Sequence, residues 1–360
     1  MSKTLVIILS ETRAHELTFD NFKKNVIDEL RADLCVCIGV KPDYDYNNPF
    51  INLAKYKFVY NEPYDFGDAF EYAYNVLSQN KPQYELLHLF SFKTLSVPAL
   101  AGTITKLADL SVEGDADLWL PTSSATEVLE MRNGVNDLHD NTTPLYWKEF
   151  LKIKDQFLGG IKDETNQHPG SAGILIFFRW FLLKNLIDND LINKYDRFII
   201  TRSDFIYQLP HPNIEIMNKS NIWIPNCEHY GGFTDRHVVL SQTNIIPYLD
   251  IFNNFVLKSN SYFMKMKMKT DWNLEKVIKF HLEQNNVLHL VKEFPYIMYS
   301  VRNINGSTRW SGGNYSDIHG YYIKYPSEFD ISTHYKNEFE KSRLPISYFY
   351  KIWFRINYNM

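Results

Sequence analysis

The segment Tyr195-Asp-Arg-Phe-Ile-Ile-Thr-Arg-Ser-Asp-Phe-Ile-Tyr207 decides how this sequence is interpreted. Its apolar run, residues 198–201, predicts a buried strand that ends abruptly at Arg202-Ser203-Asp204. In an extended chain, residues two apart point to the same side, so the charges of Arg202 and Asp204 are expected together. Ligands of open α/β sheets collect at such strand ends. The segment predicts either a ligand site or an ordinary surface ion pair after a core strand.

The N-terminal part of the chain predicts the sheet to which this strand belongs. Residues 4–9 and 33–39 are short apolar runs, and the apolar residues from Leu17 to Leu30 between them have helical spacing. This β-loop-α-β opening is typical of a doubly wound sheet. Further strands are expected at 56–60, 86–90, 222–225 and 238–240, and further helices at 67–77, 97–110, 169–187 and from Asp271 as N-cap.

We therefore predict an α/β fold with a mixed, mostly parallel sheet flanked by helices. No linker or repeat marks a boundary, so residues 1–300 are expected to form one domain. Residues 301–360 are expected to be a C-terminal loop and tail that pack on this domain or next to it.

The bulk properties exclude some partners and indicate a compartment. A net charge of −4 and a pI near 6.3 lack the basic excess of a nucleic-acid binder, so no nucleic-acid partner is expected. Cys35, Cys37 and Cys227 form no Cys-x-x-Cys motif and are expected to be inert buried thiols. The N-terminus lacks the pattern of a signal peptide. We expect a soluble, cytoplasmic protein.

Several familiar chemistries have no motif in this sequence. A Walker-type glycine-rich loop is absent, and no Gly-x-Gly-x-x-Gly follows the first strand. His15-Glu16 lacks the second histidine of a zinc-protease helix, and no Gly-x-Ser-x-Gly elbow occurs. These absences disfavour P-loop nucleotidases, dinucleotide enzymes, zinc proteases and serine hydrolases.

Three polar segments follow apolar runs, at residues 10–16, 202–204 and 231–237. In a parallel sheet such segments gather at one edge. They supply cations, carboxylates and one imidazole, namely Arg13, Arg202, Asp204, Asp235 and His237. Arginine recognises phosphate with a planar fork of donors, so this set suits a phosphorylated ligand.

A carboxylate beside a phosphate requires a divalent cation between them. Mg²⁺ or Mn²⁺ would take oxygen ligands and use substrate phosphates for the rest. Asp204 is the first candidate ligand, and His237 is a second candidate that suits Mn²⁺ better than Mg²⁺. A polar position at a strand start is the structural alternative for His237.

The order of these segments resembles the GT-A-type glycosyltransferases of polysaccharide and large-virus glycan assembly, whose fold is Rossmann-related. The resemblance rests on Ser10 to Arg13, Tyr195-Asp196, Arg202 to Asp204, Ile222 to Pro225, and Gly231-Gly232 with Asp235. It implies a nucleoside-diphosphate-sugar donor beneath the N-terminal strands and a glycan or lipid-linked acceptor. It also implies that Arg202-Ser203-Asp204 replaces an Asp-x-Asp metal motif. Because position 202 is arginine, metal dependence is an open question.

The resemblance also implies roles for single residues. Ser10, Thr12, Arg13, Arg202, Asp204 and Arg302 would contact the donor. The alternative for Arg13 is an ion pair with Glu11 or Glu16. Residues 301–321 could close over the donor with Arg302, Arg309 and Trp310, or could be an ordinary surface loop.

Asp235 is the candidate catalytic residue. It would act as a general base toward the acceptor hydroxyl, or bind a sugar hydroxyl, or serve as an ordinary turn residue. Glu275 could face the acceptor from the helix that begins at Asp271, but a solvated side of that helix is the preferred interpretation.

Two rival functions remain from the sequence. A sugar nucleotidyltransferase would use a similar sheet, but residues 10–16 contain no glycine for its phosphate loop. A non-catalytic carbohydrate-binding or virion-surface protein would use the abundant tyrosines and tryptophans for sugar stacking.

Two surface features complete the predictions. The tail at 346–358 mixes aromatic and basic residues, which suits docking on the core or peripheral contact with a membrane. Residues 264–269 alternate Met and Lys and predict an edge strand or exposed ribbon.

Overall fold

The structure is a computed structural model that describes residues 2–79, 171–269, 271–304 and 313–358. The strand predicted at 86–90 and the helix predicted at 97–110 lie outside these residues. The same holds for Arg309 and Trp310.

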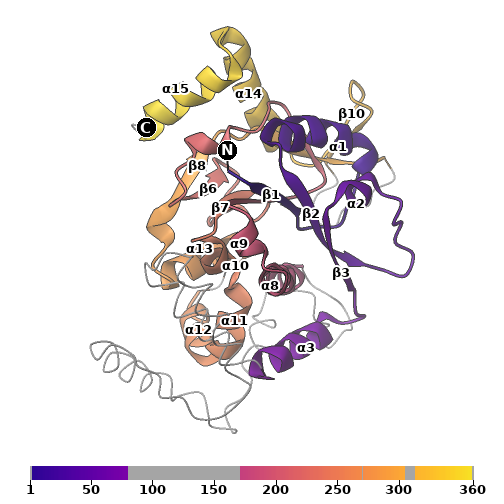
Figure 1. Cartoon of the computed structure of the whole chain (residues 1–360), viewed down its shortest axis with the longest axis vertical. Helices are drawn as coiled ribbons and strands as arrows, with labels where there is room; N and C mark the ends of the chain where they lie inside the picture. The colour runs from indigo at the N-terminus through magenta and orange to yellow at the C-terminus, as the bar shows by residue number, and fades with distance from the viewer. Residues whose placement is uncertain (1, 80–170, 270, 305–312, 359–360) are drawn as a thin grey trace.

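The centre of the described chain is a seven-stranded sheet in the order β3-β2-β1-β4-β7-β6-β8 (Figure 1). β1 pairs in parallel with β2 and β4, β2 with β3, and β6 with β8, whereas β7 runs antiparallel to both its neighbours. The strands are β1 (Thr4–Ile8), β2 (Asp33–Val40), β3 (Tyr56–Asn61), β4 (Arg197–Thr201), β6 (Ile222–Pro225), β7 (Val238–Ser241) and β8 (Val291–Phe294). This confirms the predicted mixed, mostly parallel α/β sheet.

Helices cover both faces of the sheet, as β1 and β4 require because every residue in them is buried. In the described residues, the helices on one face include α3 (Phe66–Gln79), α8 (Ala172–Asp188), α10 (Ile245–Leu249), α11 (Ile251–Leu257) and α13 (Leu274–Gln284). The other packs against α1 (His15–Phe22), its π-helical continuation η1 (Lys23–Asp28), α2 (Pro49–Leu53) and α15 (Ile346–Tyr358). α8 carries buried apolar side chains on all its sides, as a helix inside the core does.

A smaller sheet in the order β10-β11-β9-β5 joins the C-terminal part of the chain to the strand-end segment, which is Arg202-Ser203-Asp204 after β4. Its strands are β5 (Phe205–Tyr207), β9 (Met298–Arg302), β10 (Asn314–Ser316) and β11 (Tyr321–Ile323). β9 crosses the position predicted as a domain boundary, because it pairs with β5 on one side and with β11 on the other. α14 (Pro326–Ser342) and α15 follow and lie at the end of the molecule opposite α11 and α12 (Ser259–Met266) (Figure 1).

Short elements complete the described chain. They are α9 (Leu191–Lys194) and the 3₁₀ turns η3 (Ile214–Ile216) and η4 (Leu288–Leu290). In the described residues, no helix is long and apolar enough to cross a membrane.

Three local predictions were wrong. Residues 264–266 end helix α12 and form no strand, because the alternating pattern is too short to override helical packing of Tyr262 and Met266 on the core. Asn273 caps α13 by accepting a hydrogen bond from the Lys276 N–H, whereas Asp271 forms an ion pair with the Lys276 ammonium. Cys227 is exposed, unlike Cys35 and Cys37.

Candidate functional site

The segment after β4 is tied to the segment after β1. The Leu9 N–H donates to the Thr201 carbonyl (3.0 Å), which extends the pairing of β1 with β4 beyond the strand ends. The Ser203 hydroxyl donates to the Glu11 carbonyl (2.7 Å), and the Ser203 N–H approaches Ser10 Oγ (3.4 Å). The structure therefore brings together two of the predicted segments, with Ser10 supporting the strand-end segment.

Asp204 lies at the centre of this segment, between two arginines. It is only 1% exposed. Its Oδ1 accepts a hydrogen bond from Arg202 Nε (2.8 Å), and its Oδ2 accepts from Arg202 Nη2 (2.7 Å) and from Arg302 Nη1. The Arg202 contact is the bidentate geometry that gives charge-assisted pairs their specificity.

Arg302 reaches Asp204 because the small sheet positions it. Phe205 pairs with Ser300 across β5 and β9, and the Val301 N–H donates to the Asp204 carbonyl (2.9 Å). Arg302 is 2% exposed, yet its Nε and Nη2 have no hydrogen-bond partner. Buried polar groups are normally satisfied, so these two donors are available to an anionic ligand. Arg197, at the start of β4, is also buried with Nε and Nη2 unpartnered, so this feature counts here only because it lies at the strand end beside Asp204.

Arg202 and Arg302, together with Asp204 between them, form what we call the arginine cluster. The charges in and around this cluster favour the binding of a negatively charged group. Burial alone would raise the pKa of Asp204, but the charges of Arg202 and Arg302 hold it well below its ordinary value. Burial, together with the same two arginines, lowers the pKa of Lys324 to about 7. A bound anion would relieve the repulsion among these cations.

A hollow of about 270 Å³ opens beside the cluster, at the carboxyl ends of β1, β2 and β3. Its lining is polar and comes from the end of β2 and from the segments that follow the three strands: Glu11, Thr12, Arg13, Gly39, Lys41, Asp43, Tyr44, Asp45 and Glu62. Thr12 is buried, and its hydroxyl is bonded to the Tyr44 hydroxyl and to Asn48 Nδ2. Thr12 therefore shapes the wall of the hollow, and its hydroxyl is already in use.

Arg13 lies at the same hollow with a different partner from Arg302. Its Nε donates to Glu11 Oε2, so the predicted ion pair with Glu11 is present. The guanidinium remains about half exposed, and its charge acts on Arg302. Arg13 can therefore turn toward a ligand at low cost.

Asp235, in the third predicted segment, lies near other arginines: its Oδ1 is 3.9 Å from Arg236 Nε. Its carbonyl accepts from Arg179 Nη2 (3.3 Å), and its side chain is 11% exposed. Burial by itself would lower the pKa of Arg202. The charges of Asp204 and Asp235 outweigh burial and raise the pKa of Arg202 above its ordinary value. The structure therefore brings Asp235 into electrostatic reach of Arg202.

Glu275 is a site candidate that the sequence interpretation placed wrongly. It lies in the first turn of α13, where Gly232 approaches so closely that an added Cβ would be 2.0 Å from the Glu275 backbone. Burial and then the charge of Asp235 raise the pKa of Glu275 to about 7. The Gly231-Gly232 pair was the available signal, because it allows this close approach of loop and helix.

Arg236 and Glu328 form a buried ion pair that supports the site from α14. Glu328 Oε2 also accepts from the N–H of Ser300, two residues before Arg302 in β9 (2.7 Å). No sequence signal identified Glu328, because its partners lie far away along the chain.

His237 lies apart from the ion pairs, in the core. Its Nδ1 is 3.0 Å from Thr201 Oγ1, and its ring packs beside His211 and Phe294. Burial and the neighbouring His211 lower the pKa of His237 well below its ordinary value, so it is neutral.

The described residues do not fit a divalent metal centre. No group of three His, Cys, Asp or Glu side chains among them could hold a metal ion. Both oxygens of Asp204 already accept hydrogen bonds from arginine, and His237 is bonded to Thr201. A cation at Asp204 would displace these donors and stand beside two guanidinium groups.

No protein-family model and no curated protein matches this sequence. Among solved structures, similarity is found to the crystal structure of mouse xyloside xylosyltransferase 1 in its apo form. The match covers 81% of this chain and 84% of that chain, with 7% sequence identity and a TM-score of 0.33. A likeness of this degree supports neither an activity nor a site for this chain.

Proposed function

We propose that this protein is a glycosyltransferase that moves a sugar from a nucleoside-diphosphate sugar to a glycan or glycolipid acceptor. The observation that carries the proposal is the pair of unpartnered donors on buried Arg302, next to Arg202 at the end of β4. Two guanidinium groups at a sheet edge suit the adjacent phosphates of a diphosphate.

The donor would lie along the edge of the sheet. The polar hollow after β1, β2 and β3 would receive the nucleoside, with Arg13 at its side toward Arg302. The diphosphate would contact Arg202 and Arg302, and the sugar would extend toward Asp235. Ser10 and Thr12 would act indirectly, by shaping the segments that contact the donor.

The chemistry is displacement at the anomeric carbon. The bond from this carbon to the diphosphate oxygen breaks, a bond to the acceptor hydroxyl oxygen forms, and the hydroxyl proton moves to a carboxylate. The leaving diphosphate gains negative charge, which the two arginines would stabilise. In this arrangement the accepting carboxylate would be Asp235 or Glu275, and Glu275, with a pKa near 7, can exchange a proton at neutral pH.

Calorimetric titration with a panel of nucleotide sugars, free nucleotides and free glycans tests this proposal. We expect one nucleotide sugar to bind, and Arg302→Met to weaken that binding about tenfold or more. Arg355→Met, which removes an exposed arginine from α15, is the matched control and should leave affinity unchanged.

The same titration separates the rival functions. A carbohydrate-binding protein would bind the glycans and ignore the nucleotide. A nucleotidyltransferase would release pyrophosphate from a nucleoside triphosphate and a sugar phosphate.

A further inference from the structure

We propose that Arg202 and Arg302, oriented by Asp204, bind the donor diphosphate without a divalent metal ion. This inference rests on the proposed function and names how that site holds its ligand. It assigns Asp204 a positioning role in place of the predicted role as metal ligand.

The first argument is the occupancy of Asp204. Its Oδ1 accepts from Arg202 Nε, and its Oδ2 accepts from both Arg202 and Arg302. Each contact holds a guanidinium plane in a fixed orientation at the strand end. A metal ligand would need at least one of these oxygens free and directed away from positive charge.

The second argument is the number of cations that act on Asp204. Arg202, Arg302 and Lys324 all act on Asp204, and Arg13 acts on Arg302. A divalent cation would add to this repulsion, whereas a diphosphate diester brings two negative charges. The unpartnered Nε and Nη2 of Arg302 are the donors that its oxygens would satisfy.

The third argument is functional. A metal neutralises the charge that develops on the departing diphosphate. Two fixed guanidinium groups in a buried site supply the same stabilisation, because their donors need no reorganisation during the reaction.

The test is binding of the nucleotide sugar selected by the panel, measured in EDTA and in excess Mn²⁺, with inorganic pyrophosphate as a second probe. Affinities that agree within about threefold support the inference, since a required metal changes affinity far more. Binding that appears only with Mn²⁺ overturns the inference and leaves the glycosyltransferase proposal intact. Absence of nucleotide-sugar binding under both conditions overturns both.

Variants distinguish positioning from metal binding. Asp204→Asn should weaken nucleotide-sugar binding equally with and without Mn²⁺, because it disorders the arginines. Arg302→Lys should recover part of the affinity lost in Arg302→Met, since it restores charge without the planar fork. A Mn²⁺ titration that shows a site in the native protein and none in Asp204→Asn would contradict this account.

A different observation carries a second inference, about the outer face of α15. Its inner face docks on the core through aromatic side chains, of which Tyr350 and Phe354 are fully buried. Its outer face leaves Tyr348, Ile352 and Ile356 exposed at intervals of four residues. The charged side chains of the helix are Lys351 and Arg355, and it has no acidic residue.

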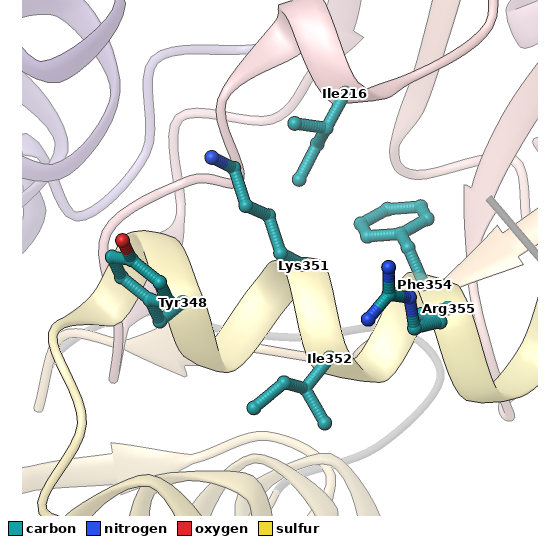
Figure 2. A pocket seen from close by; sticks show the side chains of 6 residues that line it. All are labelled: Ile216, Tyr348, Lys351, Ile352, Phe354 and Arg355. Carbon is teal, nitrogen blue, oxygen red and sulfur yellow. The ribbon is translucent and has the colours of Figure 1, made fainter.

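We infer that this outer face docks on an anionic lipid surface. Figure 2 shows Lys351 extending toward Ile216 while Ile352 points the opposite way, so cationic and apolar sectors adjoin. Lys351 and Arg355 border a hollow of about 410 Å³ whose other lining residues are Ile216, Tyr348, Ile352 and Phe354. In this inference the two cations there receive a phosphate headgroup. Apolar side chains beside uncompensated cations are typical of helices that lie in a membrane interface.

Co-sedimentation with vesicles of phosphatidylglycerol or phosphatidylcholine tests this inference. We expect binding to the anionic vesicles alone, and its loss in Ile352→Asp and in Lys351→Glu/Arg355→Glu. Ile318→Asp, which changes an isolated side chain that is 92% exposed, should bind like the native protein. Sedimentation with neither vesicle, or unchanged binding in the α15 variants, would overturn the inference.

Discussion

Asp204 is the residue on which the site depends, and its environment explains its role. A carboxylate that is fully buried between two arginines is costly to remove, because its loss leaves two cations without a partner. Arg302 is the opposite case, because two of its three guanidinium nitrogens have no hydrogen-bond partner in this structure. If the proposed function is right, Arg302 is retained for its ligand at the expense of stability.

These two residues should therefore respond differently to substitution. Asp204→Ala is expected to lower the free energy of unfolding by about 3 kcal/mol or more. Arg302→Met is expected to leave it unchanged or raised, because Asp204 keeps the bidentate Arg202 contact. Urea denaturation of both variants measures this, and equal destabilisation of the two would contradict the ligand role of Arg302.

Lys324 should make donor binding dependent on pH. Its pKa is lowered to about 7 by burial and by Arg202 and Arg302, so it gains a proton as the pH falls through 7. The diphosphate diester of a nucleotide sugar keeps its charge in this range, so affinity should rise as the pH falls.

Glu275 also titrates near pH 7, so variants must separate the two groups. Lys324→Met should flatten the affinity profile, whereas Glu275→Gln should preserve the contribution of Lys324. A profile that is flat in the native protein would argue against a diphosphate beside Lys324.

At the scale of elements, the contact between the 231–237 segment and α13 positions both candidate carboxylates. Gly232 lies against the backbone of Glu275, and the Phe233 N–H donates to the Glu275 carbonyl (3.0 Å). A side chain at position 232 would separate the loop from the helix and displace Asp235.

Gly232→Ala should therefore reduce glycosyl transfer more than it reduces donor binding. It should also cost more stability than Gly320→Ala, where a Cβ meets open space and only the positive φ is strained, at about 1 kcal/mol. Thermal unfolding together with transfer assays gives the comparison. Equal effects of the two variants on transfer would show that the 231–237 segment does not position the reaction.

The sequence predicted elements best where burial determines the residue types. β1, β2 and β4 are apolar runs buried by helices on both faces, and their pattern identified them within one or two residues. The pattern failed at 264–269 and at the cap of α13, where side-chain contacts outweigh periodicity.

The site could be predicted only in part for a similar reason. Ser10, Arg202 and Asp204 meet because strand ends of one sheet meet. The ion pair of Arg236 with Glu328 and the raised pKa of half-buried Glu275 depend on how distant helices pack, which no local pattern records.

At the scale of the whole molecule, the faces of the large sheet form the core, and the candidate site lies at the ends of its strands. Helices on both faces bury the core, while the carboxyl ends of β1 to β4 carry the polar hollow and the arginine cluster. The small sheet brings Arg302 to this edge from the C-terminal part of the chain. α15 covers the face of the large sheet that also carries α1 and α2, and its own outer side stays exposed.

The central claim is transfer from a nucleotide sugar, and product analysis tests it most directly. The purified protein would be incubated with a donor panel and mixed glycan and glycolipid acceptors, with release of nucleoside diphosphate measured in EDTA and in Mn²⁺. We predict acceptor-dependent release from one donor in both conditions, and its loss in Arg302→Met. No nucleoside diphosphate release from any donor, together with direct binding of glycans, would contradict the account.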